Sequence, residues 1–511
     1  MEDKKSILWV DDEIDLLKPH IMFLKNKGYE ITPVHNGIDA ISLVQSQHFD
    51  LVFLDVDMPG KDGLETLEDI KMIYPEMPIV MITKSEEENI MDEAIGKKID
   101  DYLIKPVNPK QILLCLKNLL EKKNIVASRA SQNYIKEYAR NQMISSSAPT
   151  FKDWLDIAGS MIKWDFEMEH LHDEGLLQTH QGQKMELNIE FGKFIEKNYP
   201  SWLKDKDPEL TLSTDIISKY VFPRIKEGQK VYFVVIDCMR LDQWMILEEV
   251  VKETFNVKRE LYYSILPTAT PYSRNSLFSG LFPSEIADKF PDIWRKGVVD
   301  ERSHNRYERQ ILAMHLKNLG MQFKDDPRYI KILDLAGSRE LLRKVKQYEQ
   351  DLLVSVVINF VDMLSHMRSE NEILLELMPD ESAYRSLTRS WFIHSNLYRI
   401  LQEFAEQKCT IIITSDHGSI LGLRGTELRG SKDVSKNLRY KYGENIACDT
   451  RHALFISHPE LYKLPTYNSL NFFYIIAKEN YYFVYPDKFQ HYQRHYRNSF
   501  QHGGISMEEM I

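Results

Sequence analysis

Cysteine is scarce in this sequence, and no two cysteines form a pairing motif. The four are Cys115, Cys238, Cys409 and Cys448, spread over 511 residues. They form no CxxC pair and give no disulfide framework, which favours a reduced, cytoplasmic setting.

Long apolar runs and an excess of positive charge are also absent, and no secretory leader is expected. No stretch is apolar over the length needed to span a bilayer. The first five residues run directly into a predicted strand, without the charged and apolar regions of a secretory signal. The formal net charge of -11 argues against binding DNA or anionic membranes through bulk charge. No helix-turn-helix pattern is recognisable, so the output domain of a transcriptional regulator is not evident.

What is present describes an ordinary globular protein of several domains. Hydrophobic residues make up 43% of the chain and charged residues 28%. A chain of 511 residues is too long for one hydrophobic core, so two to four domains are expected.

Residues 1–122 alternate apolar, strand-like runs with amphipathic helical stretches. The runs are Ile7–Val10, Tyr29–Val34, Leu51–Leu54, Ile79–Ile82 and Tyr102–Ile104. Five strand–helix units of this size predict a doubly wound parallel sheet.

Polar side chains follow four of these predicted strands. Asp11 and Asp12 follow the first, Asp55 the third, Thr83 the fourth and Lys105 the fifth. Three carboxylates at one sheet edge are a hard-oxygen site suited to Mg²⁺. Thr83 and Lys105 could then bind the oxygens of a phosphoryl group on the remaining carboxylate.

Together with Asp57-Met58-Pro59-Gly60 and Lys105-Pro106, this pattern resembles the flavodoxin-like receiver domain of two-component response regulators. The resemblance implies that Asp55 is the phosphoacceptor. It also implies an Mg²⁺ site made by Asp11, Asp12, Asp55 and the backbone carbonyl of Asp57.

The same resemblance implies a switch and two kinds of partner. Tyr102 matches the rotating aromatic residue that responds with Thr83 and Lys105. A sensor histidine kinase would supply the phosphoryl group. Receivers commonly pair through the face that carries their last strands and helices, so phosphorylation is expected to favour a homodimer.

Residues 123–205 show helical periodicity and no strand pattern. The periodic segments are Ala127–Met143, Phe151–Met168 and Leu187–Asn198, with Ser145–Pro149 and Gln178–Gln183 read as connections. We expect a small bundle of about three helices.

Residues 206–511 again place acidic and histidine side chains after apolar runs. Asp237 follows residues 231–236, and Asp416 and His417 follow residues 411–415. Asp362 and His366 follow the run 356–361, in the i, i+4 spacing that lets both reach one ion from a strand end or a starting helix. Open α/β sheets gather such residues at the carboxyl ends of their strands.

These groups predict two metal sites. Asp237, Asp416 and His417 would hold one ion, and Asp362, His366 and His502 the other. Mixed nitrogen and carboxylate ligands suit zinc, with manganese as an alternative. Two ions about 4 Å apart can clamp both oxygens of an in-line phosphoryl transfer.

A hydroxyl and an arginine complete the predicted site. Thr270 supplies a hydroxyl that metal coordination can deprotonate, and Arg274 could bind a phosphoryl oxygen. The hydroxyls of Thr268 and Thr270 cannot be ranked from the sequence alone.

The set resembles the alkaline phosphatase superfamily, and in detail its PglZ branch. The matching segments are Thr268–Pro271 running to Leu277–Gly280, Thr414–Gly418 and His502–Ser506. The resemblance implies an alkaline-phosphatase-like α/β domain with Thr270 as nucleophile beside two zinc ions.

Receiver, helical bundle and PglZ domain in that order resemble the PorX regulators of Bacteroidetes, which are linked to type IX secretion. That resemblance adds an extracytoplasmic-function sigma factor as an expected partner.

The sequence favours a phosphodiesterase over two alternatives. The basic stretch Arg424, Arg429, Lys432, Arg439 and Lys441 is expected to overhang the site, which would suit a short or cyclic oligonucleotide. One alternative is a non-catalytic, phosphorylation-dependent scaffold that binds a sigma factor. The other is a phosphomonoesterase or sulfatase, of which a sulfatase would need Cys or Ser in place of Thr270.

Overall fold

The computed structural model divides the chain into two compact units, Met1–Tyr134 and Ile135–Ile511. Each is described by itself. The structure describes residues 4–84, 95–96, 99–171, 173–205, 207–292, 305–322, 326–368, 371–430, 437–466 and 471–511.

The first unit is built on a five-stranded parallel sheet in the order β2-β1-β3-β4-β5. Its strands are β1 Ser6–Val10, β2 Glu30–Val34, β3 Leu51–Asp55, β4 Ile79–Thr83 and β5 Asp101–Ile104. Its helices are α1 Lys18–Asn26, α2 Gly37–Ser46, α3 Gly63–Ile73 and α5 Pro109–Leu116. This is the predicted receiver fold.

Alternation along the central strands explains the two cores of this sheet. In β1, Leu8 and Val10 enter the hydrophobic cluster on one face, and Ile7 and Trp9 enter the cluster on the other. A parallel sheet covered by helices on both faces needs such continuously apolar strands.

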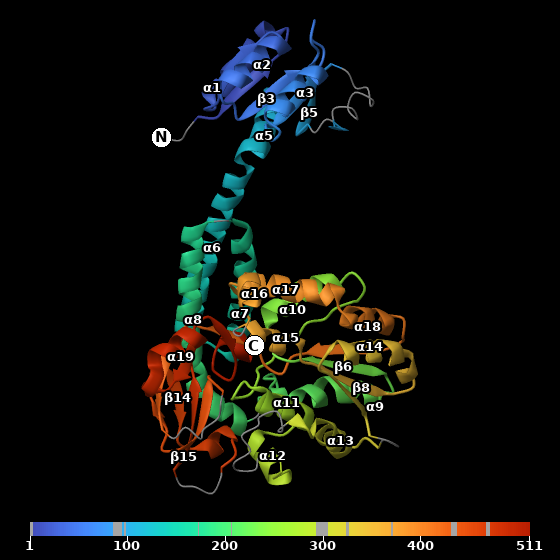
Figure 1. Ribbon diagram of the computed structural model, residues 1–511, viewed down its shortest axis with the longest axis vertical. Helices are drawn as coiled ribbons and strands as arrows, with labels where there is room; N and C mark the ends of the chain where they lie inside the picture. Colours follow the sequence, from blue (N-terminus) through green and yellow to red (C-terminus); the bar gives the residue numbers. More distant parts are fainter. Residues whose placement is uncertain are drawn as a thin grey trace. The chain divides into compact units, whose positions relative to one another are not determined.

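Three long helices follow: α6 Lys122–Ser146, α7 Phe151–Leu171 and α8 Glu174–Lys204 (Figure 1). The prediction that Gln178–Gln183 is a connection is wrong, since this segment lies inside α8. Its polar residues have tertiary partners: the ring of His180 contacts the Asp165 carboxylate at 2.9 Å, and Gln183 donates to the Tyr138 carbonyl. Asp173 caps the N-terminus of α8, where its side chain accepts from the Leu176 N–H.

The α/β part of the second unit contains a four-stranded parallel sheet in the order β7-β8-β6-β9. The strands are β6 Val231–Ile236, β7 Arg328–Ile332, β8 Leu353–Ile358 and β9 Thr410–Thr414. Its helices are α9 Phe222–Lys226, α10 Leu241–Val251, α11 Thr270–Ser279, α12 Pro283–Lys289, α13 Glu308–Asn318, α14 Leu335–Lys344, α15 Phe360–Arg368, α16 Glu372–Leu377, α17 Glu381–His394 and α18 Asn396–Ala405.

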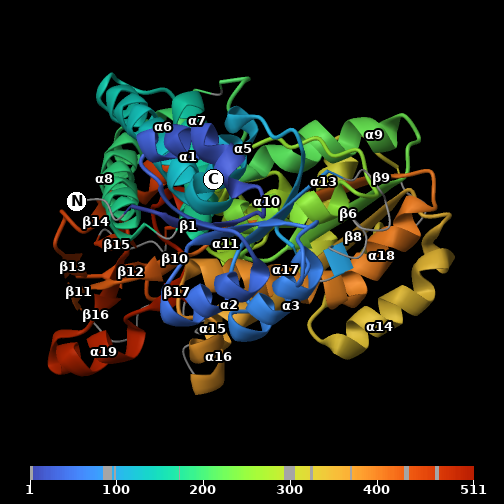
Figure 2. The same cartoon turned by 90° about the horizontal axis from the view of Figure 1, so that it is seen from above.

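Helices cover both faces of this sheet. Helices α10, α14, α15, α17 and α18 pack on one face and α9, α11 and α13 on the other (Figure 1). Figure 2 shows α14 and α18 side by side at the edge of the first layer.

Smaller strands make up the rest of the unit. They are β10 Ile420–Gly422, β11 Arg424–Arg429, β12 Tyr440–Glu444, β13 Ala447–Cys448, β14 Ala453–Ile456, β15 Phe472–Ala477, β16 Tyr481–Val484 and β17 Ser499–Gln501. Two helices, α19 Phe489–Tyr496 and α20 Met507–Met510, complete it.

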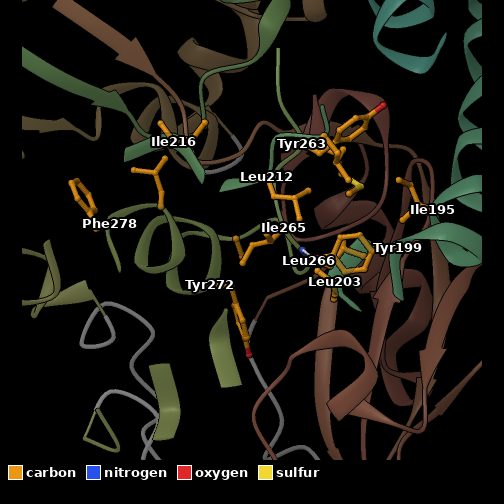
Figure 3. Packing of buried hydrophobic residues seen from close by; sticks show 14 of the residues in the cluster. Ile195, Tyr199, Leu203, Leu212, Ile216, Tyr263, Ile265, Leu266, Tyr272 and Phe278 are labelled. Carbon is orange, nitrogen blue, oxygen red and sulfur yellow. Dashed lines mark hydrogen bonds between the residues drawn. The ribbon is translucent and has the colours of Figure 1, made fainter. Parts of the chain in front are cut away.

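One hydrophobic core joins α7 and α8 to the α/β part. Tyr199 and Leu203 of α8 lie against Leu266 (Figure 3), and the Leu266 N–H donates to the Tyr199 hydroxyl at 2.9 Å. The segment that leads into α11 is therefore anchored on α8. Among the described residues, no helix is both long enough and apolar enough to cross a membrane.

Candidate metal centres and phosphoacceptor site

In the receiver, the strand ends bring the predicted acidic residues together. One ligand atom from each of Asp11, Asp12 and Asp55 lies within 4.8 Å of the others. Lys105 pairs with both Asp11 and Asp55 at 2.7 Å. Thr83, the last residue of β4, is fully buried.

The charges of this site oppose one another. Burial raises the pKa of Asp55. The hydrogen bond and the charge of Lys105 lower that pKa, but the effect of burial is larger. Burial would lower the pKa of Lys105, but its bonds to Asp11 and Asp55 hold it above its ordinary value. Within the described part of the chain, Asp55 Oδ1 is buried and has no hydrogen-bond partner. An oxygen in that condition fits a cation or an incoming phosphoryl group.

In the α/β part, Asp237, Asp416 and His417 form a first cluster, with ligand atoms within 4.8 Å of one another. Asp237 directly follows β6, and Asp416 and His417 lie just beyond β9, the neighbour of β6. Adjacent parallel strands end at the same sheet edge, which is why residues so far apart in sequence meet here.

A turn at Cys238 brings backbone groups next to the side chains of the first cluster. Cys238 has a left-handed backbone (φ 64°), which is unfavourable for a residue with a side chain. Its N–H donates to Asp416 Oδ1 at 3.2 Å. Gly418 packs closely, since a Cβ there would lie 1.9 Å from the Glu508 carbonyl oxygen. Both positions serve the geometry of the ligands beside them.

Asp362, His366 and His502 form the second cluster. β8 ends at Ile358, and Asp362 and His366 lie on α15, Asp362 in its first turn and His366 in its last. Asp362 Oδ1 lies 3.3 Å from His366 Nε2 and 3.6 Å from His502 Nε2. The two imidazole nitrogens face each other at 3.4 Å.

The two clusters are neighbours. The rings of His417 and His502 stack with their centroids 4.5 Å apart. The first cluster is wholly buried, whereas the His366 side chain is 52% exposed. Met363 and Met367 of the same helix are also exposed.

The structure separates the two threonine hydroxyls. Thr270 Oγ1 lies 3.0 Å from His417 Nε2 and donates to Asp237 Oδ1 at 3.3 Å. Thr268 is fully buried; it donates to the Gly504 carbonyl at 2.7 Å and accepts from the Gly503 N–H at 3.2 Å. Thr270 therefore points into the first cluster, while Thr268 holds the segment that carries His502.

The surroundings shift the pKa values of Asp237 and Asp362 in opposite directions. Burial raises the pKa of Asp237 well above its ordinary value, and Asp416 and Asp362 add to this against the charge of Arg274. Burial would also raise the pKa of Asp362, but His366, His502 and His417 hold it below its ordinary value. Burial and the charge of His417 lower the pKa of His502.

The donor sets fit divalent cations. Asp416 Oδ2 is buried with no hydrogen-bond partner among the residues that the structure describes. A carboxylate oxygen in that condition, beside an imidazole and a second carboxylate, is a ligand set typical of zinc-class ions. In the second cluster, two imidazole nitrogens and a carboxylate oxygen converge in the same way.

Arg274 is buried beside the first cluster. Its side chain is 2% exposed and pairs with Asp237 Oδ2 and Glu308 Oε1, both at 2.5 Å. A guanidinium held between two buried carboxylates fixes the position of Asp237. That Arg274 also binds a phosphoryl oxygen stays a prediction.

Two residues of this support were not predicted. Glu308 opens α13 and holds Arg274, and Asn359 donates to Asp237 Oδ2 at 2.9 Å. Asn359 directly follows β8, so the strand-end rule could have found it. No sequence signal pointed to Glu308.

Two residues of the expected basic rim are buried. Arg439 is fully buried against Glu509, Arg424 pairs with Glu479 at 2.6 Å, and Lys441 is buried. Arg429 is exposed, and Lys432 lies outside the described residues. The stretch follows Asp416 and His417 in sequence, but two of its arginines serve as structural ion pairs.

Comparison with known families matches three consecutive parts of the chain. The response regulator receiver domain matches residues 7–117. The PorX response regulator linker domain matches residues 124–203. The BREX system PglZ alkaline phosphatase-like domain matches residues 216–511, more than half of the chain. In this order they describe the PorX-type architecture, and the receiver implies a histidine kinase as partner.

Individual relatives match the receiver. The transcriptional regulatory protein ResD of Bacillus subtilis is 34% identical over 120 residues, which are 24% of this chain and 50% of ResD. The chain thus spans half the length of that relative. Chemotaxis protein CheY4 of Vibrio cholerae is 29% identical over 23% of this chain and 99% of its own, with a TM-score of 0.22. A two-component response regulator from Clostridium difficile is 30% identical over 24% of this chain and 99% of its own, with a TM-score of 0.23.

Proposed function

Because this chain belongs to the family of PglZ alkaline phosphatase-like domains, carried behind a receiver, we propose that it is a response regulator controlling a metal-dependent phosphodiesterase. Phosphorylation would occur on Asp55, with Mg²⁺ held by Asp11, Asp12, Asp55 and the Asp57 carbonyl. The regulated reaction would take place at the two clusters in residues 206–511.

The observation that carries this proposal is the position of Thr270 Oγ1. It lies within 3.3 Å of two side chains of the first cluster, and the second cluster adjoins it through the stacked rings of His417 and His502. A hydroxyl at the edge of paired metal-type clusters suits nucleophilic attack on phosphorus.

The ligand assignment follows the clusters. Asp237, Asp416 and His417 would hold one zinc-class ion, and Asp362, His366 and His502 the other. When bound, such ions supply Lewis-acid stabilisation of charge on the hydroxyl and phosphoryl oxygens.

The protein's own groups place the reactants. Asp237 accepts from Thr270 Oγ1 and so holds that hydroxyl for attack on phosphorus. In the attack the hydroxyl loses its proton to solvent, the Oγ1–P bond forms, and the bond to one ester oxygen breaks, so that this oxygen leaves as an alcohol after taking a proton from water. Water then hydrolyses the ester on Thr270, which releases the phosphate monoester and restores the hydroxyl. Arg274 pairs with Asp237 Oδ2 and so holds the carboxylate whose other oxygen contacts Thr270. A substrate would approach from the exposed side of the second cluster, past Met363 and Met367.

This approach bears on the substrate class. The oligonucleotide expectation rested on the basic stretch, whose Arg424 and Arg439 are engaged in ion pairs. A phosphodiester with an apolar or aromatic substituent fits the exposed methionines better than a long polyanion does.

The test combines metal analysis with hydrolysis of a generic aryl phosphodiester and the matching monoester. Thr270→Val should lose turnover and keep most of the zinc, whereas Thr270→Ser, the matched control, should keep both in large part. A Thr270→Val protein as fast as the parent would refute the nucleophile. A parent that binds zinc but cleaves neither ester would favour the scaffold alternative.

A further inference from the structure

The short helix α20 contacts α8 through a small polar network. The Met507 N–H donates to Asn188 Oδ1 at 2.9 Å. Asn188 Nδ2 donates back to the Glu508 carboxylate at 3.1 and 3.3 Å. Lys184, one turn earlier on α8, lies 3.5 Å from the same carboxylate. These groups are mostly shielded from solvent, so the contacts are little screened.

On its other side, α20 holds backbone groups that adjoin the predicted metal ligands. The Gly418 N–H, next to His417, donates to the Glu509 carbonyl at 3.0 Å. The Gly504 N–H, two residues after His502, donates to Glu509 Oε1 at 2.8 Å.

A third bond reaches the segment before Thr270. The Ser264 N–H donates to the Met510 carbonyl at 2.7 Å, and the Ser264 hydroxyl donates to the Asp416 carbonyl at 2.7 Å. Through Glu509 and Met510, the short helix α20 thus connects to three loops that bear candidate ligands or the candidate nucleophile.

We propose that Glu508 is a positioning residue: by tying α20 to Asn188 and Lys184, it lets α8 set the geometry of the loops that carry His417, His502 and Thr270. The inference rests on the proposed function for what those loops hold. The mechanical link itself is independent of catalysis.

The geometry leaves little slack in this link. A Cβ on Gly418 would lie 1.9 Å from the Glu508 carbonyl oxygen, so the ligand loop and α20 are in direct contact. Glu509 is fully buried and saturated by Arg439, Ser506 and Gly504. A shift of α20 relative to α8 must therefore move these loops or break their bonds.

The link can be tested by amide hydrogen exchange on the full-length protein, read at the Gly418 and Gly504 amides. Asn188→Asp places a carboxylate against Glu508 while preserving an acceptor for the Met507 N–H. We expect about tenfold faster exchange at both glycines, because each amide loses protection when α20 moves. Adding Glu508→Gln restores a carboxylate–amide pair with the roles exchanged, and should restore protection.

Glu196→Gln is the matched control. It removes another ion pair of α8, with Lys478 at 2.6 Å, that does not involve α20. It should leave both glycine amides protected. Thermal unfolding of every variant is measured alongside, so a general loss of stability is recognised.

Equal exchange in the parent and Asn188→Asp, or equal loss in Asn188→Asp and Glu196→Gln, would overturn the link. If Asn188→Asp does not fold, the double variant decides: a folded, protected double variant supports the link, and an unfolded one refutes it. Zinc content and ester hydrolysis, measured on the same samples, report separately on the proposed function.

Discussion

Replacing Arg274 with methionine should destabilise the α/β part instead of only weakening substrate binding. Arg274 is buried between Asp237 and Glu308, with 2.5 Å contacts to each. Methionine fills much of the same volume but leaves two carboxylates buried without their shared cation.

The magnitude follows from that geometry. Breaking a buried charge pair by removing one partner costs about 3–5 kcal/mol, because the remaining charge stays desolvated. Removing the second charge as well, with Arg274→Met and Glu308→Gln together, should recover about 0.5–3 kcal/mol of this, the usual size of coupling between contacting residues. Zinc should recover more, since an ion bound only by the folded protein stabilises it.

Thermal unfolding of the metal-free and zinc-loaded proteins measures these differences. Arg451→Met serves as the control: that side chain is 82% exposed and pairs with Asp449, so we expect a change within about 0.5 kcal/mol. An Arg274→Met protein with an unchanged midpoint and a much raised KM, at constant kcat, would refute the reasoning and return Arg274 to the substrate side.

Four further outcomes are expected. Asp55→Asn should abolish Mg²⁺-dependent labelling by a small phosphodonor; undiminished labelling would mean another acceptor. A phosphoryl mimic should raise the mass measured by sedimentation towards a dimer, and an unchanged mass over a wide concentration range would count against this. His502→Ala should lose turnover and bound zinc together, as metal analysis would show. Glu381→Gln should be less stable than the parent at neutral pH and less sensitive to acid. Burial would raise the pKa of Glu381, but Arg240 and Lys184 hold it below its ordinary value. Its stabilisation is therefore present above about pH 4.3 and lost as the pH falls through the lowered pKa; parallel acid-unfolding curves would contradict this.

The sequence predicted best where local pattern decides structure. Apolar runs of strand length ended at Asp55 and Asp237 as expected, and the sheet edges brought their partners close. The i, i+4 spacing of Asp362 and His366 allowed a strand end or a starting helix, and the structure has both residues on a helix and in one cluster.

Prediction failed where a side chain's partner is distant in sequence. Arg274 and Glu308 are 34 residues apart, and no local sequence pattern around either residue predicts that they pair. Gln178–Gln183 is polar and was read as a connection, yet tertiary contacts such as that of Gln183 with Tyr138 keep it helical. Local propensity is a weak prior against such contacts.

The fate of the basic stretch shows why charge in a sequence does not by itself indicate a binding surface. The sequence predicts Arg439 at a substrate rim, but it lies beside Gly504. The contact is close, because a Cβ added to Gly504 would lie 2.2 Å from the Arg439 guanidinium. There it fixes Glu509, which accepts from the Gly504 N–H. A buried arginine of this kind orders the His502 loop instead of attracting an anion. The same argument ranks the two threonines: Thr268 is tied to Gly504 across 236 residues, which leaves Thr270 as the hydroxyl that points into the clusters.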